Sequence, residues 1–139
     1  METTPNGIEL FGDKEYPSAI VIRQGIKVEG IEFFSPDSYS QQIGLMTRPS
    51  GYQVPPHIHN QVSRNIEQTQ EVLLIRRGKC QINLYGEGVV VETEILLSDG
   101  DVILLAHGGH EVIMLTECEI LEIKQGPYAG PQDKRAISK

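Results

Sequence analysis

The chain has little of what builds a cross-linked or cysteine-based protein. It has 139 residues with no tryptophan, 6% aromatic residues and two cysteines. Cys80 and Cys118 are far apart in the sequence, and neither has a CxxC partner. We therefore expect both to be reduced, buried thiols, with a disulfide between them as the less favoured alternative.

Long hydrophobic runs and an excess of basic charge are also missing. The longest apolar runs, such as residues 102–106, are too short to span a bilayer, and no secretory leader or basic amphipathic stretch is visible. The net charge of −7 argues against a nucleic-acid partner, which would need a basic face. These features predict a single cytoplasmic domain over residues 1–139, with neither nucleic acid nor membrane as a partner.

Short segments rich in Val, Ile, Leu and Tyr alternate with breaks at Gly, Pro and Asp, and no helical stripe is present. Many evenly spaced strands predict an all-β sandwich or barrel. Tight connections at 77–79 and 85–89 further predict a meander of three antiparallel strands over 71–97. The expected strands are 19–23, 31–34, 41–48, 52–59, 71–77, 79–85, 89–97, 101–106, 110–115 and 118–124.

The most informative segment is 51–78, where His57 and His59 alternate along a stretch that Pro55 and Pro56 keep extended. Residues i and i+2 of a strand share a face, so both imidazoles can point into one cavity. Glu71 opens the apolar strand that follows, where a carboxylate is costly unless it is paired or coordinated. Two imidazoles and a carboxylate are ligands for a divalent transition metal. The alternative is that Glu71 is only the exposed start of its strand and that the histidines are ordinary surface or core residues.

Two further histidines, His107 and His110, follow a second apolar strand. Gly108 and Gly109 lie between them and permit an unusual turn or a close backbone approach. All four histidines of the chain therefore fall into two clusters, each after a strand-like segment.

Together these two clusters resemble the two motifs of the cupin family. The first runs from Gly51 through five residues to His57-Ile58-His59, and then from Glu71 through six residues to Gly78. The second runs from Gly100 through residues 101–105 to the segment 106–110. The resemblance covers about residues 41–125 and implies a double-stranded β-helix, a cupin jelly-roll barrel. It also implies a metal bound by His57, His59, Glu71 and His110.

The chain departs from the family pattern at three places. Eleven residues separate His59 from Glu71, Ala106 replaces the motif proline, and the last histidine comes one residue early. For the fourth ligand we expect His110 first, His107 second and Glu111 third, and Glu67 competes with Glu71 as the carboxylate. The metal can be Fe, Mn, Ni, Zn or Cu, because imidazole and carboxylate suit all five.

Other polar residues near the motifs are candidates for substrate binding and acid–base chemistry. An arginine at a barrel mouth can bind a carboxylate or phosphate through two hydrogen bonds. The alternative for each arginine is a solvated surface residue. On the last strand Glu122 and Lys124 either line the interior or, as alternation favours, face water while Ile120, Leu121 and Ile123 supply the core. The candidates are Arg48, Arg64 and Lys124 for substrate and Tyr52, Glu67 and Glu111 for proton transfer.

The leading functional hypothesis is a metal-dependent enzyme acting on a small polar or anionic metabolite, such as a sugar or sugar phosphate, by isomerase, epimerase or lyase chemistry. The alternatives are an iron-dependent dioxygenase and a ligand-binding or regulatory cupin without turnover. We also expect a homodimer, because cupins commonly dimerise and N-terminal strands are natural edge-pairing elements.

Overall fold

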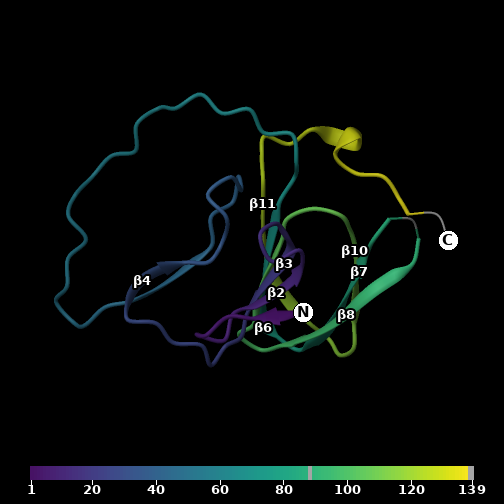
Figure 1. Ribbon diagram of the computed structural model, residues 1–139, viewed down its shortest axis with the longest axis horizontal. Helices are drawn as coiled ribbons and strands as arrows, with labels where there is room; N and C mark the ends of the chain where they lie inside the picture. Colours follow the sequence, from purple (N-terminus) through teal and green to yellow (C-terminus); the bar gives the residue numbers. More distant parts are fainter. Residues whose placement is uncertain (88, 138–139) are drawn as a thin grey trace.

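Strands account for nearly all the regular structure in the computed structural model, which describes residues 1–87 and 89–137 (Figure 1). The one 3₁₀ helix in these residues is η1 (Gly130–Asp133), and no helix among them is long and apolar enough to cross a membrane. The strands are β1 (Glu2–Thr3), β2 (Glu9–Gly12), β3 (Pro17–Ile22), β4 (Gly30–Phe33), β5 (Gly44–Thr47), β6 (Glu71–Arg77), β7 (Lys79–Tyr85), β8 (Val91–Ser98), β9 (Val102–Leu105), β10 (Gly109–Met114) and β11 (Glu119–Lys124).

These strands form three antiparallel sheets. A six-stranded sheet has the order β1-β2-β3-β9-β6-β11, a three-stranded sheet has the order β10-β7-β8, and β4 and β5 form a separate pair. The prediction of an all-β protein is therefore confirmed.

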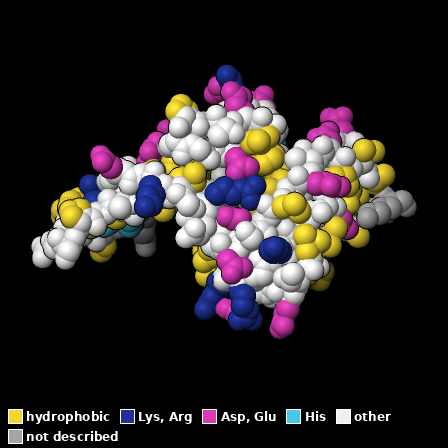
Figure 2. Space-filling view, turned by 90° about the horizontal axis from the view of Figure 1, so that it is seen from below, with side chains coloured by type: hydrophobic (Ala, Val, Ile, Leu, Met, Phe, Trp, Pro, Cys, Tyr) yellow, Lys and Arg dark blue, Asp and Glu magenta, His cyan; other side chains and the backbone are white. Residues whose placement is uncertain are grey.

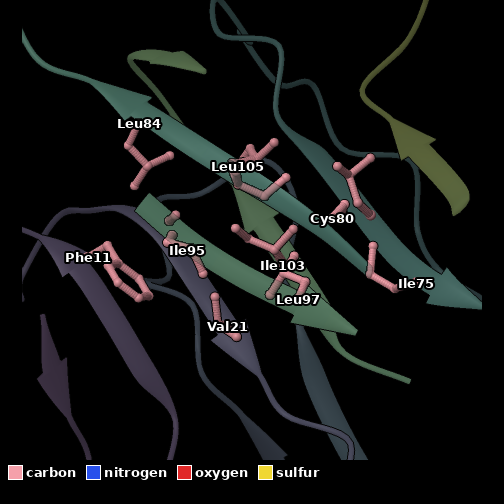
Figure 3. Close-up of a cluster of buried hydrophobic side chains, with 12 residues drawn as sticks. Phe11, Val21, Ile75, Cys80, Leu84, Ile95, Leu97, Ile103 and Leu105 are labelled. Atoms are coloured by element: carbon pink, nitrogen blue, oxygen red, sulfur yellow. The ribbon is translucent and has the colours of Figure 1, made fainter. Parts of the chain in front are cut away.

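The main core lies between the six-stranded and the three-stranded sheet (Figure 3). Alternate residues of each strand point inward, as the two-residue period of a strand requires. From β7 these are Cys80, Ile82 and Leu84, and they meet side chains of β3, β6, β8 and β9. The Cys80 thiol is thus a core group, and both cysteines are free.

A second cluster covers the other face of β3 and β9. Ile20 and Leu104 lie in it, packed with Tyr39 and Ile43 from the connection between β4 and β5. Because β3 and β9 are buried on both faces, their sequences read as continuous apolar runs rather than alternating ones.

The stability of this second cluster depends on pH because it contains the phenol of Tyr39. Its hydroxyl donates to the carbonyl of Pro17, and burial raises the Tyr39 pKa from 10.0 to about 12. The stability that comes from the neutral phenol is therefore complete below pH 10.0 and is lost as pH rises toward 12.

We expect Tyr39→Phe to cost about 1 kcal/mol at neutral pH, because it removes one hydrogen bond. The same variant should lose part of the wild-type decline in unfolding free energy between pH 10 and 12, measured by urea titration. Tyr128→Phe is the control, because this ring is 79% exposed. An unchanged alkaline profile in Tyr39→Phe would refute this role.

Most of the expected strands are present, but the one expected at 52–59 is absent. Every residue from 46 to 68 is exposed, and no strand lies between β5 and β6. Pro55 and Pro56 lack the N–H groups that a ladder uses, and no neighbouring strand of the chain comes alongside them. We call residues 44–67, which comprise β5 and this long loop, the arm; it stands away from the sheets in Figures 1 and 2.

The expected three-strand meander is also wrong in its first pair. β7 does pair with β8, whereas β6 pairs with β9 and β11 in the other sheet. The chain turns the corner at Gly78, which has φ +105°, and a Cβ there would lie 2.3 Å from the Glu117 carbonyl oxygen. Only glycine fits this turn, and the turn sends consecutive strands into opposite layers. Of the other expected connection, at 85–89, Gly88 lies outside the described residues.

Candidate metal centre

Glu71 and His110 meet at one end of the core, although one belongs to each sheet. Glu71 is the first residue of β6, and His110 lies near the start of β10. The His110 Nε2 is 3.3 Å from Glu71 Oε1, and the side chains are 30% and 19% exposed, respectively. This contact joins the two sheets at a half-buried rim that ligands can reach from solvent.

The end of β11 lies alongside the same rim. In the ladder between β11 and β6, Lys124 lies opposite Glu71 and Glu122 lies opposite Leu73. The side chains of Lys124 and Glu122 therefore lie on the same inner face of the sheet as the Glu71 carboxylate. Leu121 and Ile123 point to the opposite face, where they are 46% and 51% exposed. The favoured interpretation, that these two residues supply core, is therefore wrong; only Ile120 packs against it.

The carboxyl groups of Glu71 and Glu122 lie close together on the inner face of neighbouring strands and interact with each other. The hydrogen bond with His110 lowers the pKa of Glu71 to about 2, and the interaction with Glu71 raises the pKa of Glu122 above its usual value. Glu71 is therefore held ionised beside His110.

Lys124 is held over this rim by the segment that contains η1. Its Nζ lies 3.1 Å from Asp133 Oδ2, and Asp133 also accepts a hydrogen bond from Thr69 Oγ1 at 3.0 Å. The Tyr128 ring is 5.6 Å from the same ammonium. These contacts fix a positive charge beside Glu71 and leave it at the surface.

His57 and His59 lie on the exposed loop of the arm, apart from this rim. Their rings are 5.2 Å apart in an edge-to-face arrangement, and His57 Nδ1 is 2.9 Å from the Pro55 carbonyl oxygen. Within residues 1–87 and 89–137, no three His, Cys, Asp or Glu side chains are grouped so that they could hold a metal. The four expected ligands thus form two pairs in this chain, and the full set stays a prediction.

The other candidates for the fourth ligand point elsewhere. His107 stacks on Tyr16, with centroids 4.3 Å apart, and its Nε2 is 3.1 Å from the Tyr16 carbonyl oxygen. Glu111 pairs with Asn83, accepts a 2.8 Å hydrogen bond from its amide and a 3.3 Å one from Tyr85, and faces away from the core. Of the three, His110 is the one that contacts Glu71.

The remaining candidates lie on the arm. The Arg48 guanidinium lies 4.3 Å from the centre of the Tyr52 ring, a cation–π pair. Arg64 and Glu67 line a hollow of about 1010 Å³ between the loop and the connection from β4 to β5. Within the described part of the chain, none of these four residues forms an ion pair or hydrogen bond with Glu71 or His110.

Sequence reasoning missed Asp133 and Thr69, and it did not assign Glu122 to the site. The signal for Glu122 was its two-residue spacing from Lys124, which puts both on one face of β11. Asp133 and Thr69 carried no such signal, because their contacts depend on how the C-terminal segment folds back.

Comparison of the chain with models of known protein families, with curated proteins and with solved structures found no match.

Proposed function

We propose that Glu71 and His110 are half of a divalent transition-metal site of the cupin type, completed by His57 and His59. The observation that carries the proposal is the 3.3 Å contact between Glu71 Oε1 and His110 Nε2 across two sheets. It joins two residues 39 positions apart, Glu71 from the first cupin-like motif and the preferred fourth ligand from the second. The two facing antiparallel sheets support a jelly-roll arrangement.

The chemistry of the rim fits a metal. A ligating carboxylate must be ionised, and His110 keeps the pKa of Glu71 at about 2. Both side chains remain partly exposed, so an ion and a small ligand can enter. Imidazole and carboxylate together suit Fe, Mn, Ni, Zn or Cu. When bound, such an ion supplies Lewis-acid polarisation of a substrate oxygen.

The charged residues around the rim indicate which class of ligand the site would bind. The Lys124 ammonium beside Glu71 attracts an anionic group. Glu122, whose pKa the Glu71 carboxyl raises, is the candidate for proton transfer to a ligand bound at the rim. A small polar or anionic metabolite such as a sugar or sugar phosphate fits these groups. The reaction we propose is of the isomerase, epimerase or lyase type, which needs one proton donor and one stabilised oxyanion.

Anion binding to the Co²⁺-loaded protein tests this proposal. Titration with sugar phosphates should change the visible Co²⁺ spectrum, and neutral sugars should change it less. We expect Lys124→Ala to weaken sugar-phosphate binding about tenfold, because it removes the positive charge at the rim. Lys27→Ala, at an exposed position away from the rim, is the control. A spectrum that no sugar phosphate alters while Co²⁺ stays bound would exclude this ligand class.

A further inference from the structure

Both sheets end in strands that lack a partner on one side. Within residues 1–87 and 89–137, β10 pairs only with β7 and β11 only with β6. Each open edge carries exposed apolar side chains, with Ile113 and Met114 on β10 and Leu121 and Ile123 on β11. Open, apolar strand edges are templates for pairing with another extended segment.

The arm can supply the partner segment that these open edges lack. Residues 46–68 are exposed, with a turn at Ser50 and Gly51 and no regular structure in 52–67. Pro55 and Pro56 favour an extended course for the segment around them. Within the described residues β5 pairs only with β4, so one side of β5 is free. Residues 52–59 are long enough to pair with all of β10, which has six residues. The arm also exposes several apolar side chains, namely Met46, Tyr52, Val54, Ile58, Val62 and Ile66.

Contacts at the base of the arm hold it away from its own sheets. The Gln41 backbone N–H donates to Gln70 Oε1 at 2.9 Å, and its side chain donates to Gln125 at 2.8 Å, so both ends of the arm are fixed beside the end of β11. Asn6 donates to Glu32 on β4 at 2.8 Å, and β4 in turn pairs with β5. In Figure 2 the resulting lobe projects from one side of the body and carries exposed hydrophobic side chains.

We propose that two copies of the chain exchange arms, so that each arm pairs with β10 and β11 of the other copy. One arm and one pair of open edges per copy match in a closed two-fold dimer. Pro55 and Pro56 would then lie in a new edge strand. Because successive N–H groups point to opposite edges of a strand, one proline leaves a gap in the ladder with the partner strand, and the other faces outward and prevents further pairing.

The exchange also places His57 and His59 of one copy beside Glu71 and His110 of the other. The part of the inference that concerns metal rests on the proposed function, and the exchange of arms does not. Each body contributes a carboxylate and an imidazole, and each arm contributes two imidazoles. The metal site would then be composed of residues from two chains and would be incomplete in either alone.

Mixing two defective variants tests whether the site spans two chains. His57→Ala/His59→Ala removes the arm ligands, and Glu71→Gln/His110→Ala removes the body ligands, so each variant alone should bind no Zn²⁺. When the two are unfolded and refolded together, random pairing gives mixed dimers with one intact site. The expected Zn²⁺ content is about a quarter of the wild-type value. A mixture as empty as its components would show that the arm does not cross between chains.

A measurement without metal tests the exchange itself. Light scattering on the metal-free wild-type protein should give twice the 15.5 kDa mass of the chain. Val54→Glu/Ile58→Glu should weaken dimerisation at least about tenfold, because these side chains become covered between copies. The control is Val90→Glu, a 68% exposed valine outside the arm. A metal-free monomer, or an arm variant that dimerises like the wild type, would overturn the proposal.

The two measurements separate the two proposals. If the arm-dependent dimer forms but no Zn²⁺ binds to the wild type, the proposed function fails and the exchange of arms stands. If Zn²⁺ binds to a monomer, the exchange fails and the proposed function stands.

Discussion

Replacement of Asp101 with alanine is expected to lower the free energy of unfolding by about 3 kcal/mol, because it leaves two backbone donors without their buried acceptor and removes one of the two carboxylates that pair with Arg23. Asp101 is 5% exposed and accepts from the backbone N–H groups of Gln24 at 3.0 Å and Ser98 at 2.9 Å. Its carboxylate also lies 3.2 Å from Arg23 Nη1. The residue thus ties the turn before β9 to the end of β3.

Urea unfolding of the variant measures this loss, and Asp99→Ala provides the matched control in the same turn. Asp99 accepts a single 2.7 Å hydrogen bond, from the backbone of Gly78 at the surface. We expect its replacement to cost about 1 kcal/mol. If Asp101→Ala costs no more than Asp99→Ala, the buried network does not stabilise the sheets as described.

Substitution of Glu71 by glutamine is expected to lower the affinity for Zn²⁺ at least about 100-fold, because a neutral amide replaces an ionised ligand of nearly the same shape. Glu71 is ionised at neutral pH, and the contact with His110 lowers its pKa further, from 4.5 to about 2. His110→Ala should have an effect of similar size, since it removes one imidazole ligand. Competition titration against a chromophoric chelator at pH 7 measures both.

Glu119→Gln is the control for this experiment. Glu119 lies at the other end of β11, in ion pairs with Arg76 and Arg77. Its replacement changes the net charge by the same amount and should leave the Zn²⁺ affinity unchanged. Equal affinities for Glu71→Gln and Glu119→Gln would show that Glu71 is not a ligand.

The sequence was enough to predict most strands of the two facing sheets, although β1 and β2 were not expected. The alternation of Cys80, Ile82 and Leu84 gives one buried face, and the glycine at 78 ends one strand before the next begins. Pairing was harder to predict, because a tight turn usually joins neighbours in one sheet. The positive φ of Gly78 and the crowding around it instead make a corner between layers.

Half of the candidate site was also predictable. Glu71 was preferred because six residues separate it from Gly78, and His110 was the first choice for the fourth ligand although it comes one residue earlier than the motif places it; the fold brings the two into contact. The other two expected ligands, His57 and His59, were placed on a strand at 52–59. That strand is absent, because a strand needs a neighbouring strand as well as extended residues. Local sequence gives the extended character of the His57 segment and cannot say which edge, in which copy, receives it. The contact of Lys124 with Asp133 likewise depends on the path of a distant segment.

The most direct test of the proposed metal centre is the metal content of the purified chain after supplementation with Fe, Mn, Ni, Zn and Cu in turn. We expect about one equivalent per chain of at least one of these metals in the wild type, and less than about a tenth in His57→Ala/His59→Ala. A wild type with less than about a tenth of an equivalent of every metal would contradict the account, and so would a histidine variant that retains the wild-type content.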